Sequence, residues 1–437
     1  MSRLCRVHRR VVGLSIGIVL AFTGALRAEV LTLDQCIDIA LEHSPSMANA
    51  RYSLGLARQN VWSAWGDWLP QFSASAGYGY NEQGGVSTYQ FSNRIVRSFS
   101  KSIGVQQSLF SWGGEWFNIK NRLLLRRSSE HRLTQSELET IDQIKNLYFG
   151  GLKAKGLLEV SEQAVAAAEE NLKLVQARFD LGSANQSELL KAKVQLLFNR
   201  SALEQARRNL AVTLAQLNNA MNRPATTLIE LDSRFDTLSV NVDYDAAMAF
   251  AREHHPQVLA AEAELQAARY QRLAVRSSFL PSISWDVRRS YSVRAGGHWG
   301  SFSKDISNTS FGMSLGWSIP FLDGFSRKTS HARATAAYKL AQIEQESTVN
   351  GVGLAVQTAL LDINNARANL ALYEESLRSA EEDLQIAQER YNLGAATILD
   401  LLDAEKNLAD ARQQSVSAKF DFNLAVAALD KAMGKRQ

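Results

Sequence analysis

The chain of 437 residues carries 48 lysines and arginines against 44 aspartates and glutamates. Five of the arginines and none of the acids lie within residues 1–28, so the rest of the chain is close to neutral and gives no reason to expect a nucleic-acid partner. Cys36 is the one cysteine beyond residue 28, which excludes a disulfide framework and a cysteine metal site.

Residues 1–28 have the pattern of a signal peptide. Basic residues precede an apolar run over residues 11–26, and Leu26-Arg27-Ala28 fits a cleavage site. An N-terminal membrane anchor is the alternative interpretation. Beyond this segment no apolar run is long enough for a transmembrane helix. A mature chain that crosses a membrane would have to do so as a β-barrel, because only helices and closed barrels satisfy their backbone groups in lipid.

The remaining residues predict helices and strands in an order that occurs twice. The first copy should contain helices over 33–43 and 46–68, strands over 71–80 and 98–109 joined by a loop over 81–97, and helices over 114–181 and 185–221. The second copy should contain helices over 243–254 and 257–279, strands over 282–293 and 309–319 joined by a loop over 294–308, a helix over 325–393 and a last helix capped by Thr397.

Matching motifs about 211 residues apart mark the two copies. Pro45 corresponds to Pro256, Gly113 to Gly324, and Arg-Phe-Asp-Leu-Gly over 178–182 to Arg-Tyr-Asn-Leu-Gly over 390–394. This period is too long for a solenoid repeat. We therefore predict a tandem internal duplication within one body, with a first repeat over 29–223, a linker over 224–242 and a second repeat over 243–437.

The four strands alternate apolar residues with polar or very small ones. In the clearest strand Phe311, Met313 and Leu315 face one side, and glycines and serines face the other. This pattern over about ten residues is typical of a transmembrane β-strand, and a half-buried strand of a soluble sandwich is the alternative. The strand over 98–109 is less regular, because Lys101 and Gln107 fall on its apolar side.

Four strands cannot close a membrane barrel, and open sheet edges are not tolerated in lipid. Other protomers must therefore complete the sheet. Two protomers would give a barrel of about eight strands filled by its own side chains, whereas three would give one wide enough for a channel.

The last two helices carry a coiled-coil seam. Apolar or small residues alternate at spacings of three and four from Val349 to Tyr391, and again from Leu401 to Ala432, where Ser415 is the one polar member. This pattern predicts left-handed supercoiling against neighbouring helices. A helix over 325–393 would be roughly 100 Å long.

These motifs and their order resemble the TolC family of outer-membrane efflux and export channels over essentially the whole chain beyond residue 28. The most specific stretch is Y-N-L-G-A-A-T-I-L-D-L-L-D-A over 391–404, with its partner over 178–182. The resemblance implies a mixed, mostly α-helical fold: a homotrimer whose 12-stranded transmembrane β-barrel, four strands per protomer, is continued through the periplasm by a long coiled-coil α-helical barrel. It also implies a periplasmic adaptor, an inner-membrane transporter and outer-membrane lipid as partners.

Asp400 and Asp403 lie one turn apart on one face of the last helix. From the residues alone the simpler interpretation is that Asp400 completes a capping box with Thr397 and that Asp403 is solvated. The resemblance instead implies that both belong to aspartate rings at a periplasmic pore gate, where threefold symmetry gathers six carboxylates and attracts cations. Glu188 stands where family members often carry an acid that helps to hold the tip closed. The basic residue of that lock is replaced here by Ala396.

Leu181, Gly182, Leu393 and Gly394 are expected at two hairpin tips. Each glycine follows a helix in the C′ position, where a left-handed backbone is favoured, so helix capping explains the glycines. The resemblance further implies that these tips dock the helical hairpins of the adaptor.

Three tryptophans, Trp62, Trp65 and Trp68, repeat just before the first strand. Their spacing fits an interfacial aromatic belt and helix packing equally well, so both alternatives stay open.

No motif indicates an enzyme. The stretch from Gly312 to Gly316 matches G-x-S-x-G, but the strand alternation continues through it and no helix follows Ser314. A phosphate-binding loop, a nucleophile–base set and metal-ligand spacing are all missing from the sequence, so we expect no catalytic residue, cofactor or metal site.

The leading functional hypothesis is a passive exit duct, the outer-membrane channel component of a tripartite efflux or type I secretion system, located in the outer membrane and extending into the periplasm. The alternative is a periplasmic coiled-coil scaffold or adaptor without a pore. The alternating strands favour the duct. The sequence carries no signal for the transported substrate.

Overall fold

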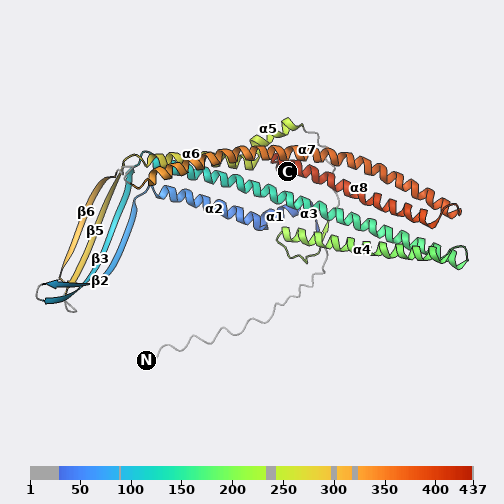
Figure 1. The fold of residues 1–437 in the computed structure, drawn as a ribbon, viewed down its shortest axis with the longest axis horizontal. Helices are drawn as coiled ribbons and strands as arrows, with labels where there is room; N and C mark the ends of the chain where they lie inside the picture. Colours follow the sequence, from blue (N-terminus) through green and yellow to red (C-terminus); the bar gives the residue numbers. More distant parts are fainter. Residues whose placement is uncertain (1–28, 88–89, 233–242, 297–302, 317–322, 436–437) are drawn as a thin grey trace, which may run out of the picture.

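The structure, a computed structural model, describes residues 29–87, 90–232, 243–296, 303–316 and 323–435. The molecule is elongated, with a sheet at one end and two helical hairpins at the other (Figure 1). The predicted signal peptide and residues 233–242 of the predicted linker lie outside the described residues, so neither prediction is tested there.

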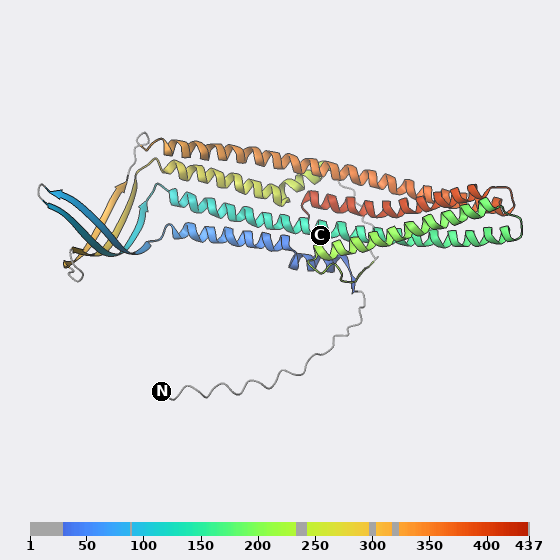
Figure 2. The ribbon, with the colours of Figure 1, turned by 60° about the horizontal axis from the view of Figure 1, so that its bottom comes forward.

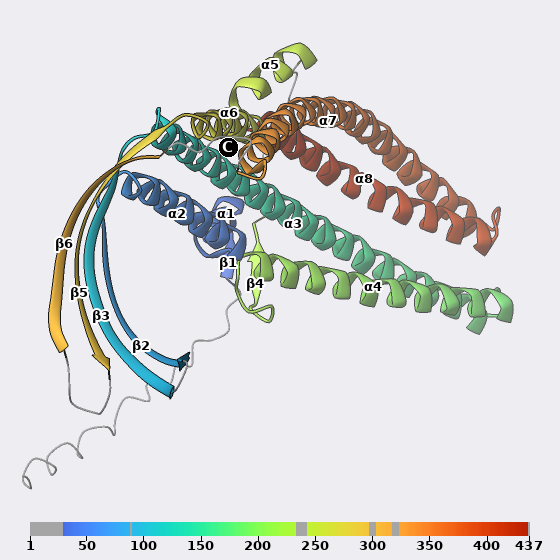
Figure 3. The ribbon, with the colours of Figure 1, turned by 60° about the vertical axis from the view of Figure 1, so that its left-hand side comes forward.

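Four antiparallel strands form one curved sheet in the order β2-β3-β5-β6 (Figure 3). They are β2 (Gln71–Ser87), β3 (Gln90–Phe110), β5 (Ser282–Gly296) and β6 (Ser303–Gly316). The pairing of β5 with β6 keeps apolar residues opposite one another, as in Trp285 with Met313. On β6, Phe311, Met313 and Leu315 are 74%, 68% and 72% exposed. The apolar face of the sheet is therefore uncovered in the single chain.

The predicted loops over 81–97 and 294–308 are wrong in extent, because strand pairing continues into both. β2 and β3 stay paired as far as Ser87 with Gln90, and β5 and β6 as far as Arg294 with Ser303. Backbone hydrogen bonds pair these additional strand residues, although polar residues and glycines interrupt the alternation of apolar and polar side chains. The side-chain alternation therefore ends before the strands do. Residues 317–319 of the predicted last strand lie outside the described residues.

The helices of the described chain are α1 (Leu33–His43), α2 (Pro45–Gly66), α3 (Gly114–Asp180), α4 (Gln186–Ala220), α5 (Tyr244–His254), α6 (Pro256–Ser277), α7 (Ser326–Asn392) and α8 (Ile398–Met433). Next to the sheet, α2, α3, α6 and α7 lie side by side in one layer (Figure 2). α3 and α7, of 67 residues each, continue beyond this layer, and α4 and α8 return along them. None of the described helices has an apolar stretch long enough to span a membrane.

The order α1-α2-β2-β3-α3-α4 is repeated as α5-α6-β5-β6-α7-α8. The repeat boundaries given above remain predictions, but the repeated order explains why each half contributes one strand hairpin and one long helical hairpin. The two halves meet in the sheet where β3 pairs with β5, and in the helical layer where α3 contacts α6.

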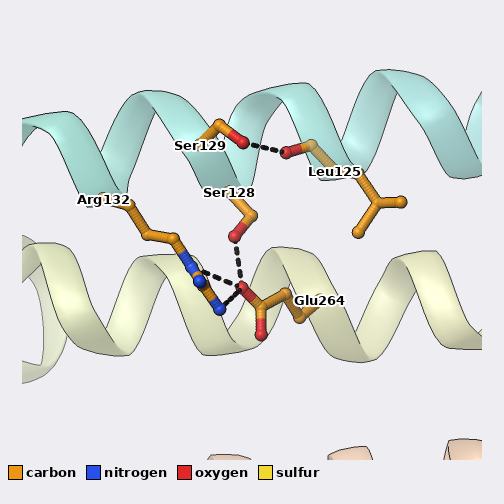
Figure 4. Close-up of polar contacts among 5 residues, drawn as sticks. All are labelled: Leu125, Ser128, Ser129, Arg132 and Glu264. Carbon is orange, nitrogen blue, oxygen red and sulfur yellow. Dashed lines mark hydrogen bonds and ion pairs between the residues drawn. The ribbon is translucent and has the colours of Figure 1, made fainter. Parts of the chain in front are cut away.

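A polar cluster fixes α3 against α6 (Figure 4). Glu264 accepts hydrogen bonds through Oε1 from Ser128 Oγ at 2.5 Å and from Arg132 Nε at 2.9 Å. Asn121 Nδ2 donates to the carbonyl of Ala267 at 2.8 Å. Because Asn121 and Ser128 are buried, their hydrogen bonds satisfy polar groups that would otherwise destabilise the contact between the halves.

The predicted seams are confirmed as the buried faces of α7 and α8. Every predicted α8 member from Leu401 to Ala432 is buried, Ser415 included, and the α7 members from Val349 to Tyr391 are buried or half-buried. α8 packs against both α7 and α3. Leu401 is 2% exposed, so its truncation to alanine should cost about 2–5 kcal/mol.

A small parallel sheet midway along the molecule was missed by the sequence prediction (Figure 3). β1 (Glu29–Leu31) pairs with β4 (Ile229–Leu231), which falls inside the predicted linker. The Tyr148 hydroxyl of α3 lies 2.8 Å from the carbonyl oxygen of Asp232 and 3.1 Å from that of Leu31. Three-residue strands are too short for a recognisable alternation, which explains the omission.

The three tryptophans before β2 do not form part of the buried core of the chain. Trp62 and Trp68 are 70% and 51% exposed, and the rings of Trp65 and Trp68 lie 6.0 Å apart. Packing within the single chain therefore does not account for Trp62, and its role at a membrane or protomer interface remains a prediction.

Candidate gate and docking site at the hairpin tips

Both hairpins turn with the same backbone geometry. Gly182 and Gly394 have φ angles of 74° and 73°, as the C′ prediction requires. In the first tip Ser183 N donates to the carbonyl of Arg178 at 2.8 Å, and the second tip has the equivalent bond. Leu181 and Leu393, which precede the glycines, are each 83% exposed. Each tip thus presents one leucine to solvent on a hydrogen-bonded turn.

The helices that leave the tips begin with reciprocal caps. Thr397 N donates to Asp400 Oδ2 at 2.8 Å, and Asp400 N donates to Thr397 Oγ1 at 3.3 Å, which confirms the predicted capping box. In the first hairpin Glu188 N donates to Asn185 Oδ1 at 3.0 Å, and Asn185 Nδ2 donates to Glu188 Oε1 at 2.9 Å. Glu188 and Asp400 therefore occupy equivalent positions, each held by its own cap.

The candidate gate carboxylates Asp400 and Asp403 are both exposed in the single chain. Hydrogen bonds from the backbone N–H and the hydroxyl of Thr397 hold the pKa of Asp400 below its ordinary value. In the single chain these hydrogen bonds therefore favour the ionised form of Asp400.

A contact between the two hairpins involves a residue that the sequence did not single out. The guanidinium of Arg178, in the last turn of α3, lies 4.5 Å from the ring centroid of Tyr391 in α7. It also donates to Asn392 Oδ1 at 3.2 Å and to the carbonyl of Tyr391 at 3.4 Å. We call these three residues the tip clasp. Its one sequence signal is the motif shared by 178–182 and 390–394, which does not reveal which arginine crosses between hairpins.

An apolar cluster lies behind the tip clasp and includes residues from both hairpins. Its buried members are Val175, Leu189, Ala192, Tyr391, Ile398 and Leu401. Ala396, at the position where the resemblance implied a basic residue, packs against this cluster. The tips are therefore held together by apolar burial and by Arg178, without a cation at position 396.

Further along α8, a carboxylate is half-buried against α3. Asn171 Nδ2 lies 3.2 Å from Glu405 Oε1 and 3.4 Å from Oε2. Burial raises the pKa of Glu405 to about 6, and the hydrogen bond from Asn171 partly opposes the rise. The packing of α8 on α3 close to the hairpin tips therefore involves a carboxyl group with a pKa of about 6.

The arrangement can bind surfaces and attract ions, but it holds no set of groups for catalysis. Ser314 of the G-x-S-x-G stretch lies in β6, with its Oγ 2.8 Å from Ser284 Oγ on the polar face of the sheet. Within the described ranges, no three histidine, cysteine, aspartate or glutamate side chains are placed to hold a metal ion.

The fold and the paired tips define a class of proteins that carry a strand hairpin and a long helical hairpin in each half. The model of the outer membrane efflux protein family matches residues 36–223 and again residues 249–435. The chain therefore belongs to the outer membrane efflux protein family. It is a channel protein of the outer membrane and not an enzyme. The predicted family, the predicted channel function and the predicted location are therefore confirmed.

Known relatives are similar to the chain over nearly its whole length. Outer membrane protein TolC of Vibrio cholerae is 24% identical, with 90% of this chain and 89% of the relative covered. The pyoverdine export outer membrane protein OpmQ of Pseudomonas putida is 26% identical, with 92% and 85% covered. Among solved structures, the outer-membrane channel OprN has a TM-score of 0.79 at 17% identity, with 92% of this chain and 90% of OprN covered. OprN therefore shares the fold of this chain.

Proposed function

We propose that three copies of the chain form the exit duct of a tripartite efflux or type I secretion system. Their sheets close a 12-stranded barrel, their helices form a duct through the periplasm, and their tips meet an adaptor that links the duct to an inner-membrane transporter. Relatives named for pyoverdine export and for alkaline protease secretion support this role. The observation that carries the proposal is the open sheet with one uncovered apolar face.

The two edges of the sheet support closure by head-to-tail association. Among the described strands, β2 pairs with β3 alone and β6 pairs with β5 alone, so each end of the sheet has a free edge. Unpaired backbone groups are unfavourable in lipid. Pairing β2 of one copy with β6 of the next removes every edge, and a closed ring follows if the rotation between copies is constant. Three copies give a lumen, whereas two give about eight strands that fill their own interior.

Exposed apolar stripes on two helices also support head-to-tail association of the copies. α4 exposes Leu190, Val194, Leu197 and Phe198, each at least half exposed. α7 exposes Leu354, Leu361, Leu372 and Ile386, each more than half exposed. α7 lies along one border of the molecule and α2 and α4 along the other (Figure 1), so one stripe can cover the other between neighbouring copies. Exposed patches of this kind are typical of protein interfaces.

In this assembly Asp400, Asp403 and Glu188 form the gate at the periplasmic end. Threefold symmetry gathers six aspartates, which attract cations and repel one another. The tip clasp takes over the closing contact that Ala396 does not provide, because Arg178 joins α3 to the end of α7. Opening then requires the two hairpins of one chain to separate at Tyr391.

We further propose that the tips dock the adaptor. Leu181 and Leu393 supply apolar contacts, and Gly182 and Gly394 supply turns that other residues adopt only with strain. The contact is therefore specific in shape and small in area.

The test is the mass and the conductance of the protein extracted from outer membranes in mild detergent. The proposal requires a mass of about three chains and single-channel currents in planar bilayers. A stable monomer would refute the assembly, and a trimer that never conducts would favour the scaffold alternative.

A further inference from the structure

Among the side chains that the structure describes, two basic ones interrupt the apolar face of the sheet. Lys101 pairs with Tyr291, and Ile103 pairs with Arg289, in the register of β3 with β5. Paired residues of an antiparallel sheet and residues two apart on one strand share a face. Lys101 and Arg289 therefore lie on the same face as Ile103 and Tyr291, and both are exposed. We call them the basic pair.

The basic pair has no carboxylate partner among the described residues. As diagonal neighbours on adjacent strands, Lys101 and Arg289 have Cα atoms about 7–8 Å apart. Lys101 Nζ lies 4.7 Å from the ring centroid of Tyr291. The nearby acid, Asp286, belongs to the other face, where its carboxylate lies over Gly312. Among the described side chains, two like charges thus share an apolar face without an anion to neutralise them.

The position of the basic pair along the strands matches the outer border of a membrane. From Leu109, beside the start of the helical region, to Lys101 the strand rises roughly 26 Å at about 3.3 Å per residue. Strand tilt reduces this to roughly 20 Å, close to the height of about 25 Å of the apolar band of outer-membrane barrels. Tyr78 and Phe99 pair just beyond Lys101 and are 68% and 41% exposed, as in an aromatic girdle.

We propose that Lys101 and Arg289 bind a phosphate group of a lipid in the outer leaflet. The proposal rests on the proposed trimeric barrel, because it takes the apolar face as the one in contact with lipid. Cations at the border of an apolar region are stabilised when an anion accepts their hydrogen bonds, and a guanidinium and an ammonium together suit a phosphate. The outer leaflet of an outer membrane contains a glycolipid, lipid A, whose sugars carry phosphates at this level.

The test is native mass spectrometry of the detergent-extracted trimer titrated with diphosphoryl lipid A and, separately, with phosphatidylglycerol. Three further proteins are compared with the wild type: Lys101→Gln with Arg289→Gln, the charge-preserving Lys101→Arg with Arg289→Lys, and a matched control, Lys173→Gln with Lys193→Gln. The control lysines are exposed on α3 and α4. Because the glutamines remove charge from an apolar face, the first variant should still fold and insert.

We expect the glutamine variant to bind diphosphoryl lipid A about tenfold more weakly than the wild type. The charge-preserving variant and the control should match the wild type. Phosphatidylglycerol binding should fall by a smaller factor than lipid A binding, because this lipid carries one phosphate where diphosphoryl lipid A carries two. Equal lipid A affinity in the wild type and the glutamine variant overturns the site. An equal loss in the control also overturns it. An equal fall for phosphatidylglycerol overturns it too, because it would indicate a site for any lipid phosphate and not one for the outer-leaflet glycolipid. The same spectra separate the two proposals, because monomers alone would refute the barrel itself.

Discussion

Replacement of Glu405 by glutamine should stabilise the packing of α8 on α3 at neutral pH and have little effect in acid. The Glu405 carboxylate is half-buried, and burial raises its pKa to about 6. Asn171 donates to it, while Asn171 Oδ1 is buried without a hydrogen-bond partner. A glutamine at position 405 keeps an acceptor for Asn171 and adds an amide donor for Oδ1, so the substitution removes the charge without removing the contact.

The magnitude follows from the pKa. A rise from 4.5 to about 6 corresponds to about 2 kcal/mol against the ionised form, and partial solvent exposure reduces this to about 1 kcal/mol per chain. The folded state binds the proton more tightly than the unfolded state. The contribution of Glu405 to wild-type stability is therefore fully present below pH 4.5 and is lost as the pH rises from 4.5 to about 6. The glutamine variant should be more stable than the wild type by about 1 kcal/mol per chain above this range and equal to it below.

The assay is thermal unfolding in detergent, followed by the helical circular dichroism signal between about pH 4 and pH 8 at one heating rate. Glu382→Gln is the matched control, because Glu382 is exposed on α7. We expect an increased midpoint for Glu405→Gln that disappears in acid, and no pH-dependent difference for the control. A difference of equal size at every pH, or a less stable Glu405→Gln at pH 8, would refute the reasoning.

Three further predictions concern the tips. Asp400→Asn with Asp403→Asn should reduce the cation preference of the channel in planar bilayers and leave trimers intact, whereas wild-type selectivity would leave only the capping role. Gly394→Val should strain the turn by about 1–2 kcal/mol and weaken adaptor crosslinking and export, and unchanged crosslinking would remove the docking assignment. Arg178→Gln should weaken the tip clasp by about 1–3 kcal/mol and increase resting conductance, with Lys173→Gln as control; equal conductance in both would show that Arg178 does not hold the gate.

Interactions between residues close in sequence were predictable. Thr397 and Asp400 are three residues apart, so their capping box follows from the local helix geometry. Gly182 and Gly394 adopt positive φ because a helix ends immediately before each of them. The α8 seam needs one periodicity sustained over the helix, and that periodicity determines which side is buried.

Contacts between distant segments were not predictable in the same way. Asn171 and Glu405 are 234 positions apart, and Arg178 and Asn392 are 214 apart. The residues next to Glu405 in the sequence do not indicate that it is half-buried. The apolar periodicity of α8 predicts which face of the helix is buried, but it does not predict which residues of other helices pack on that face. The limits of the strands were missed for a related reason, since backbone pairing can continue where side-chain alternation has ended.

The pairing of β1 with β4 has a consequence for the order in which the protein folds. It joins Glu29 to Ile229, and the apolar core beside it is drawn almost entirely from the first half of the chain. A chain delivered to the periplasm from its N-terminus can therefore complete this core while the second half is still in transit. The strand hairpin of the first half cannot complete its sheet at this stage. β3 can pair with β5 only after residue 282 has entered the periplasm. During that interval β2 and β3 expose apolar side chains and a free edge. We therefore expect periplasmic chaperones to bind this partly folded intermediate.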